Sequence, residues 1–175
     1  MDTVLAKRLA PLKLMVFDVD GILTDGRLYY TDSGAEIKAF HAADGQGFRM
    51  LADSGLKIAL ITARRSDLVE RRARDLGVHF CFQGAEAKLE AFTEVLGELK
   101  LEPAQAGYMG DDLLDLPVLL RAGFAATVPD AAADVRTRCH YTTARSGGSG
   151  AAREVCELIL RAQGTYDALL AGYCK

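Results

Sequence analysis

The sequence predicts an α/β fold in which helices flank a parallel β-sheet. Residues 14–17, Leu-Met-Val-Phe, form a short apolar run suited to a strand that is covered on both faces. Strand and helix signals then alternate along the chain, which is the pattern of parallel strands joined by helices. Asp18 and Asp20 directly follow the first strand, and open α/β sheets bind ligands beyond the carboxyl ends of their strands. We therefore expect an active site at this point.

The other elements follow from apolar runs, helix boundary signals and turn residues. We expect strands at 14–17, 57–62, 78–82, 106–109 and 124–128, and helices at 66–76, 86–100, 112–121 and 151–162, with Gly77 closing the first helix. Two runs with β character, 28–30 and 36–40, flank the turn-forming sequence Thr31-Asp32-Ser33-Gly34. This arrangement predicts a β-hairpin at about residues 26–41 that projects beside the first strand.

No repeat or clear linker divides the chain, so we expect residues 1–175 to form a single domain with a substantial core. The candidates for flexible segments are the tail from 164 to 175 and the glycine-rich segment 145–150. The glycine-rich segment is either a simple connector before the last helix or a ligand-contacting loop, and the sequence favours neither reading.

Composition and charge narrow the class of partner. The net charge is −3 and no basic cluster is present, which argues against nucleic acid or an anionic membrane as the main partner. The first eight residues lack the apolar core of a secretory signal, and no apolar run approaches the length of a bilayer span. We therefore expect a cytoplasmic protein. The four cysteines are far apart and are expected to be reduced, and the three histidines show no zinc-ligand spacing with them.

Four groups of polar residues recur in chain order, each at or just beyond an expected strand end. They are Asp18 with Asp20, Thr62, Lys88, and the pair Asp111-Asp112 with Asp115. Each has a simpler explanation when taken alone. Two acids at a strand end are common in turns, a lysine on a helix is usually solvated, and a threonine after a strand can cap a helix. Their occurrence together and in this order is specific.

These motifs resemble the haloacid dehalogenase-like phosphatases, whose pattern is D-x-D after the first strand, Thr or Ser after the second, a lysine opening a later helix, and an acidic G-D-D or G-D-x-x-x-D stretch. The resemblance implies a Rossmann-like fold, Asp18 as nucleophile and Asp20 as general acid and base. It also implies a Mg²⁺ ion held by Asp18, the Asp20 carbonyl and Asp111, with Asp112 and Asp115 in supporting roles. Thr62 and Lys88 would contact the phosphoryl oxygens.

The chemistry of a phosphate monoester explains why such residues gather. A phosphate dianion repels an attacking carboxylate, so a metal ion and fixed donors must neutralise it before in-line attack. Mg²⁺ prefers oxygen ligands in octahedral geometry. Gly21 allows the backbone to turn sharply and to approach a ligand closely. The segments between the motifs are too short for a cap domain, so the cleft is expected to be open to a large substrate or closed by neighbouring subunits.

Nearly the whole chain is similar to the family of 3-deoxy-D-manno-octulosonate 8-phosphate (Kdo 8-phosphate) phosphatases. The segments that carry this resemblance are 18–26, 38–41, 44–47, 61–64, 110–112 and 153–156. The family acts in lipopolysaccharide biosynthesis. The resemblance also implies a small sugar-acid phosphate as substrate, Mg²⁺ as cofactor, and an uncapped homotetramer. In such a tetramer the projecting hairpins would meet at the centre.

A sugar acid carries a carboxylate remote from its phosphate, so a second cationic site is needed to recognise it. Arg64 and Arg72 fit this requirement because arginine offers a planar fork for a carboxylate. Ala63 stands where family members usually have glycine, and its methyl group would narrow the backbone approach to the phosphate. Ala43 and Ser149 replace residues that are often basic in the family. These departures weaken the substrate assignment more than the reaction class.

Two alternatives stay open. Related phosphatases that act on nine-carbon sugar acid 9-phosphates tend to have glutamate where this chain has Arg64. A non-catalytic oligomeric module, like the phosphatase-like domains appended to sugar-nucleotide transferases, belongs to a different class. The complete set of acids argues against this module, because clustered carboxylates repel each other without a metal.

Overall fold

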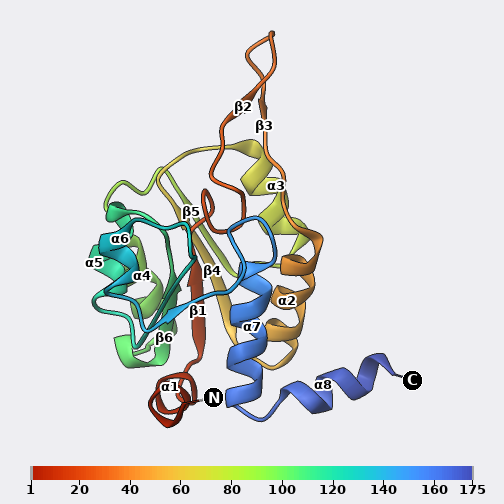
Figure 1. Cartoon of the computed structure of the whole chain (residues 1–175), viewed down its shortest axis with the longest axis vertical. Helices are drawn as coiled ribbons and strands as arrows, with labels where there is room; N and C mark the ends of the chain where they lie inside the picture. Colours follow the sequence, from red (N-terminus) through yellow and green to blue (C-terminus); the bar gives the residue numbers. More distant parts are fainter. Residues whose placement is uncertain (1, 175) are drawn as a thin grey trace.

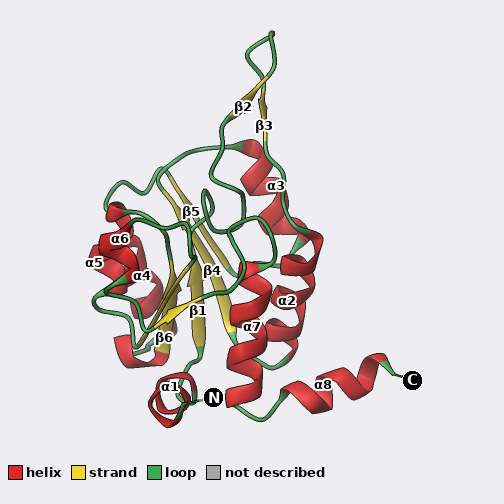
Figure 2. Ribbon diagram, in the orientation of Figure 1, coloured by secondary structure: helices red, strands yellow, loops and turns green. Residues whose placement is uncertain are grey.

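A computed structural model describes residues 2–174 of the chain. Six parallel strands form one sheet in the order β5-β4-β1-β6-β7-β8, and helices cover both faces (Figures 1 and 2). The strands are β1 (Leu14–Phe17), β4 (Lys57–Thr62), β5 (Phe80–Gln83), β6 (Ala106–Met109), β7 (Phe124–Thr127) and β8 (Tyr141–Thr142). The predicted α/β class and parallel sheet are confirmed.

The helices form two layers around the sheet. They are α1 (Thr3–Leu9), α2 (Ala42–Asp53), α3 (Asp67–Asp75), α4 (Lys88–Leu99), α5 (Leu116–Leu119), α6 (Ala133–Arg136), α7 (Ala151–Ala162) and α8 (Tyr166–Tyr173), with 3-10 turns η1 (Pro103–Gln105) and η2 (Leu113–Asp115). Helices α2, α3 and α7 lie on one side and α4, α5 and α6 on the other (Figure 2). No helix of the described part of the chain has both the length and the apolar character needed to cross a membrane.

Strand β1 lies at the centre of the core. All four of its residues are buried, as expected for a parallel strand with helices on both faces. Its register pairs Met15 with Ile58 of β4 and with Gly107 of β6. The Phe17 ring packs against Phe48 of α2, with the ring centroids 4.6 Å apart. These contacts fix the point where the chain leaves β1 and enters the loop that carries Asp18 and Asp20.

The sheet order places a crevice next to β1. The chain runs from β1 to β4 and β5 on one side, and later returns to β6, β7 and β8 on the other. Loops that follow β1 and β6 therefore diverge at the carboxyl edge, which is the position where open α/β sheets bind ligands.

The predicted hairpin is present and projects away from the sheet (Figure 1). It consists of the antiparallel strands β2 (Tyr29–Tyr30) and β3 (Glu36–Ile37), closed by a turn in which Gly34 adopts a positive φ of 83°. Its second arm is shorter than the predicted strand at 36–40. The reason is that Lys38 turns toward Asp20 and Phe40 packs against the core, so these residues leave the strand ladder.

Two expectations about local structure need correction. The helix expected at 112–121 is instead the turn η2 followed by the short helix α5. Asp112 caps η2 through the Leu113 backbone N–H, and Asp115 is buried against the sheet, so the segment folds around these two acids. The tail expected to be flexible contains α8, where the Tyr173 hydroxyl accepts a hydrogen bond from Gln46 Nε2 at 2.6 Å.

Candidate active site

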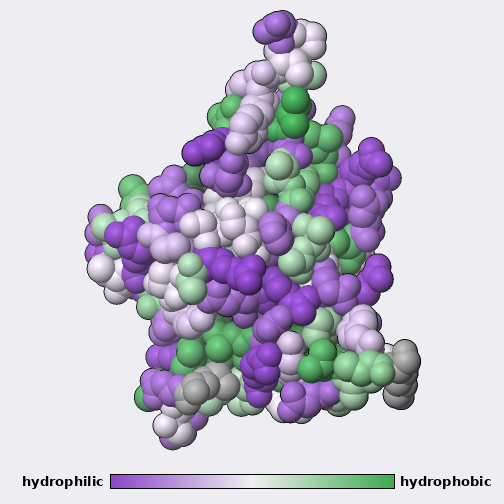
Figure 3. All heavy atoms as spheres, turned by 45° about the vertical axis from the view of Figure 1, so that its right-hand side comes forward, coloured by the Kyte–Doolittle hydropathy of each residue, from purple (hydrophilic) through white to green (hydrophobic). Residues whose placement is uncertain are grey.

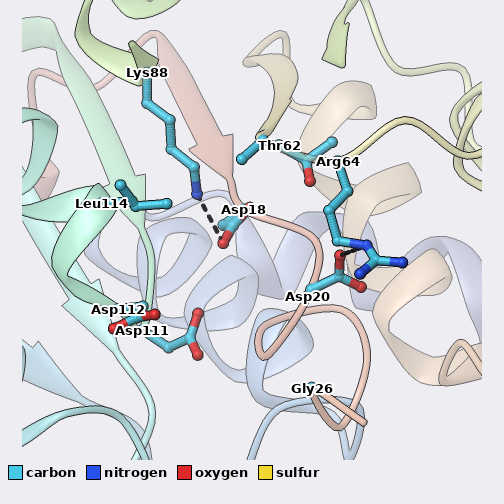
Figure 4. A pocket seen from close by; sticks show the side chains of 10 residues that line it. Asp18, Asp20, Gly26, Thr62, Arg64, Lys88, Asp111, Asp112 and Leu114 are labelled. Atoms are coloured by element: carbon cyan, nitrogen blue, oxygen red, sulfur yellow. Dashed lines mark ion pairs between the residues drawn. The ribbon is translucent and has the colours of Figure 1, made fainter. Parts of the chain in front are cut away.

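A cavity of about 270 Å³ lies at the carboxyl ends of β1, β4 and β6 (Figure 4). Its lining combines four acids, two basic side chains and the backbone of tight loops. The lining residues are Asp18, Asp20, Gly26, Thr62, Ala63, Arg64, Lys88, Asp111, Asp112 and Leu114. The cavity thus brings together side chains from four motifs that lie up to about 90 residues apart in the sequence.

Asp18 directly follows β1, and its backbone N–H donates to the Met109 carbonyl of β6 at 2.9 Å. Its carboxylate contacts Lys88 Nζ at 2.9 Å, and both side chains are less than a tenth exposed. Burial, reinforced by the nearby charge of Asp115, raises the pKa of Asp18 to about 7, although Lys88 acts in the opposite direction. The two carboxylates also raise the pKa of Lys88 despite its burial, so this lysine remains protonated.

Asp115 organises the acidic loop and is fully buried. Its Oδ1 accepts hydrogen bonds from Lys88 Nζ at 2.6 Å and from the Tyr108 hydroxyl at 2.7 Å. Its Oδ2 accepts from the backbone N–H groups of Asp111 and Asp112, at 3.0 and 3.1 Å. Four donors therefore occupy the Asp115 carboxylate, which positions Lys88 and the loop after β6.

Asp111 is the acid that lacks such donors. Its Oδ1 is buried and has no hydrogen-bond partner among the described residues. Burial, together with the charge of Asp115, raises the pKa of Asp111 to about 7. One carboxylate oxygen each from Asp18, Asp111 and Asp115 lie within 4.8 Å of one another. Because Asp115 is already satisfied, Asp18 and Asp111 are the side chains that fit a divalent cation, which would provide the missing partner for Asp111.

The loop after β1 requires glycine where it approaches the acids. Gly21 has a φ of 87°, and a Cβ atom there would overlap the Asp111 carboxylate. The glycine-rich segment packs behind the same loop, because Gly148 N–H donates to the Ile22 carbonyl at 3.0 Å and a Cβ on Gly147 would overlap the Gly21 carbonyl oxygen. Segment 145–150 thus supports the loop from behind and does not line the cavity.

A second set of charges surrounds Asp20 at the mouth of the cavity. Asp20 forms an ion pair with Lys38 of the hairpin, and Arg64 Nε lies 3.8 Å from its other carboxylate oxygen. Glu36 joins the same group, because its Oε1 is 2.7 Å from Arg64 Nη2 and 3.6 Å from Lys38 Nζ. The hairpin therefore contributes two charged residues to the site. Figure 4 shows the contact between Arg64 and Asp20.

The structure places the other candidate residues as follows. Thr62 is the last residue of β4, is almost fully buried and lines the cavity beside Ala63. Arg72 does not line it. Its guanidinium lies over the Phe40 ring, 5.6 Å from the centroid, and donates to the His41 carbonyl at 3.4 Å. Arg64 and Arg72 are therefore not brought together at one position.

Several residues of the site have no role in the sequence-based prediction. The sequence indicates only a strand at Tyr108, although a buried tyrosine hydroxyl needs a partner and so points to a buried acid. Glu36 and Lys38 alternate with Ile37 in the sequence, which places both charges on one face of a strand but does not indicate which face turns inward. Leu114 gave no signal, because an apolar residue in a predicted helix is normally assigned to the core.

Comparisons with known proteins agree with the geometry. No protein-family model matches the chain. The 3-deoxy-D-manno-octulosonate 8-phosphate phosphatase of Yersinia pestis is 45% identical over 157 residues, which cover 90% of this chain and 84% of that protein.

Two solved structures extend this similarity to three dimensions. The phosphatase of the same name from Moraxella catarrhalis, crystallised with a magnesium ion, a phosphate ion and Kdo, has a TM-score of 0.95 and 43% identity, covering 97% of both chains. The cobalt-bound form of the corresponding phosphatase from Haemophilus influenzae has a TM-score of 0.91 and 36% identity, covering 96% of this chain and 99% of that one. The resemblance drawn from the motifs is confirmed, and the chain belongs to the 3-deoxy-D-manno-octulosonate 8-phosphate phosphatase family of the haloacid dehalogenase-like superfamily.

Proposed function

We propose that this chain is a Mg²⁺-dependent phosphatase that hydrolyses Kdo 8-phosphate to Kdo and inorganic phosphate, and that residues 1–175 act as one catalytic domain. The observation that carries the proposal is the pairing of Asp18 with Lys88 beside an unpartnered Asp111 oxygen in one cavity. The Moraxella catarrhalis relative, which was crystallised with magnesium, phosphate and Kdo, supports the same assignment.

The reaction proceeds in two steps. In the first, an Asp18 oxygen attacks phosphorus in line, the bond to the sugar oxygen breaks, and Asp20 gives a proton to the departing alkoxide. In the second, Asp20 accepts a proton from water as the water oxygen attacks the aspartyl-phosphate and releases phosphate. A bound Mg²⁺, held by Asp18, the Asp20 carbonyl and Asp111, would neutralise phosphoryl charge during both steps.

The remaining cavity residues bind and orient the phosphoryl group. Lys88 places its positive charge next to the nucleophile, and Asp115 holds it there. Thr62 donates its hydroxyl to a phosphoryl oxygen, while the backbone at Gly21 and Ala63 approaches the phosphate closely. Asp112 caps the turn after β6 and keeps the acidic loop in place.

Recognition of the sugar acid is assigned to Arg64 at the cavity mouth. Its side chain is 41% exposed, so a substrate carboxylate can reach it without unfolding the site. Arg72 would contribute from behind Phe40, where it holds the segment between the hairpin and α2. A role for Arg72 in direct contact with substrate requires a movement of this segment.

We further propose a homotetramer in the cytoplasm that serves lipopolysaccharide biosynthesis. The hairpin exposes a group of large hydrophobic side chains: Leu28, Tyr29, Tyr30 and Ile37, each at least 40% exposed. Figure 3 shows hydrophobic atoms along this projection. A second copy of the chain would cover them, and sedimentation velocity tests the tetramer directly.

Phosphate release tests the activity. Kdo 8-phosphate, a nine-carbon sugar acid 9-phosphate and simple hexose phosphates are each incubated with the protein and Mg²⁺, with Asp18→Asn as the blank. A strong preference for Kdo 8-phosphate that the blank abolishes is expected. Similar rates on all three substrates would retain the phosphatase and reject the substrate, whereas a preference for the nine-carbon acid would reject the role of Arg64.

A further inference from the structure

Lys38 is a buried cation of the hairpin that the reaction described above does not use. Its side chain is 3% exposed, and its ammonium group contacts Asp20 Oδ1 and, at 3.6 Å, Glu36 Oε1. A buried ammonium group is costly unless carboxylates compensate it. Lys38 therefore depends on Asp20, and the orientation of the Asp20 carboxylate depends on Lys38.

Two lysines contact different acids of the site. Lys88 contacts Asp18 and Asp115, whereas Lys38 contacts Asp20 and Glu36. Arg64 is the other cation near Asp20, but its side chain is 41% exposed, its Nε lies 3.8 Å from Asp20 Oδ2, and its Nη2 is closer to Glu36. An exposed and shared ion pair constrains a side chain weakly. Lys38 is thus the group that fixes the Asp20 side chain.

We propose that Lys38 is a positioning residue that holds Asp20 in the orientation needed for proton transfer. This inference rests on the proposed phosphatase reaction with Asp20 as general acid and base. Lys38 occupies Oδ1, which leaves Oδ2 to exchange a proton with the leaving oxygen and then with water. Proton transfer requires hydrogen-bond geometry, so a carboxylate that rotates freely serves it poorly. The hairpin is consequently part of the catalytic apparatus.

The leaving group distinguishes this role from a purely structural one. A sugar alkoxide needs a proton as it departs, whereas p-nitrophenolate leaves without one. Loss of Lys38 should therefore slow the first step on Kdo 8-phosphate far more than on p-nitrophenyl phosphate. A general decrease in folded protein would lower both rates equally.

The test measures product release in a single turnover with each ester. Lys38→Met nearly keeps the length of the side chain and removes its charge. We expect the release of Kdo to slow about 10- to 100-fold, while the release of nitrophenolate changes less than about threefold. Lys38→Arg keeps a cation and should give an intermediate ratio of the two rates. The matched control is Lys57→Met. Lys57 is an exposed lysine at the end of β4 opposite Thr62, so this variant should leave both rates unchanged.

A double variant completes the experiment. Lys38→Met should add no further loss on Kdo 8-phosphate when Asp20 is already Asn, because the group that Lys38 orients is gone. If Lys38→Met does not fold, the lowered ratio in Lys38→Arg decides the matter. Equal losses on both esters, or a further loss in the Asp20→Asn background, would overturn the inference. Failure of the wild-type protein to hydrolyse either ester would overturn the proposed function, and the inference with it.

Discussion

Asp115→Asn should destabilise the protein strongly although the substitution removes no atom from the core. The carboxylate is fully buried and accepts hydrogen bonds from four donors, one of which is the Lys88 ammonium. An asparagine amide must turn its NH₂ group toward either the Lys88 and Tyr108 donors or the two backbone N–H groups. Two donors then face a donor, and Lys88 keeps only the Asp18 carboxyl as a hydrogen-bond acceptor.

The magnitude follows from these contacts. Breaking a buried ion pair costs about 3–5 kcal/mol, and the remaining contact with Asp18 places the expected loss near the lower end, about 3 kcal/mol. The charge of Asp115 also repels Asp18 and Asp111, whose pKa values it helps to raise to about 7. Above pH 7, removing that repulsion offsets part of the loss in the free energy of unfolding. The full effect is therefore expected at pH 6, where Asp18 and Asp111 are mostly protonated.

Urea unfolding without Mg²⁺ measures the effect. With a slope of about 2 kcal/mol per M, a loss of about 3 kcal/mol lowers the unfolding midpoint by about 1.5 M. Asp112→Asn is the matched control, because Asp112 is an exposed cap of the same turn and asparagine caps equally well. It should change the free energy of unfolding by less than about 0.5 kcal/mol. A loss below about 1 kcal/mol for Asp115→Asn at pH 6 would refute the reasoning.

Further outcomes concern pH, magnesium, the glycine-rich segment and Glu36. The pKa values of Asp18 and Asp111 rise from an ordinary 3.8 to about 7 on folding. Between pH 3.8 and about 7 the folded protein without metal therefore binds more protons than the unfolded chain. Its free energy of unfolding falls as pH rises through that window. Mg²⁺ competes with the same protons, so the increase in melting temperature that it produces should be larger at pH 8 than at pH 5, and a larger increase at pH 5 would contradict the assignment. Gly147→Ala places a methyl group against the Gly21 carbonyl oxygen. It should lower kcat and also lower the free energy of unfolding by about 1–3 kcal/mol. The control Gly97→Ala in α4, where open space surrounds the glycine, should raise the free energy of unfolding by about 0.5–1 kcal/mol. Urea unfolding compares the two variants, and equal effects would show that the glycine-rich segment does not support the catalytic loop. Glu36→Gln weakens the partner that holds Arg64 and should lower KM for the sugar-acid phosphate by about threefold without lowering it for hexose phosphates. An equal decrease in KM for both substrate types would show that Arg64 does not recognise the substrate carboxylate.

The parts of the fold that the sequence predicts are those governed by local patterns. The apolar run of β1 and the acids after it define both the central strand and the position of the site, because parallel strands end at a common edge. Asp18, Thr62, Lys88 and Asp111 therefore reach one cavity, although their catalytic roles stay predictions.

Contacts between distant segments explain what the sequence does not predict. Lys38 and Asp20 are 18 residues apart, and no periodic pattern links an arm of a hairpin to the loop before it. The helix expected at 112–121 breaks because Asp115 is drawn into contact with Lys88, 27 residues away. Arg72 fitted a substrate contact by residue type alone, whereas the packing of Gly45 and Phe40 against its guanidinium decides where it lies.

Side chains alternate along the second arm of the hairpin, so its exposed surface and its contacts with the site depend on the same backbone segment. Glu36 and Lys38 face Asp20 and Arg64 at the mouth of the cavity, while Ile37 between them is 52% exposed on the opposite side. In the proposed tetramer, a change in the surface that covers Ile37 would move the same short backbone segment that carries Lys38. Under the two proposals above, a substitution at this surface would change both the contacts between copies of the chain and the position of the Asp20 carboxylate.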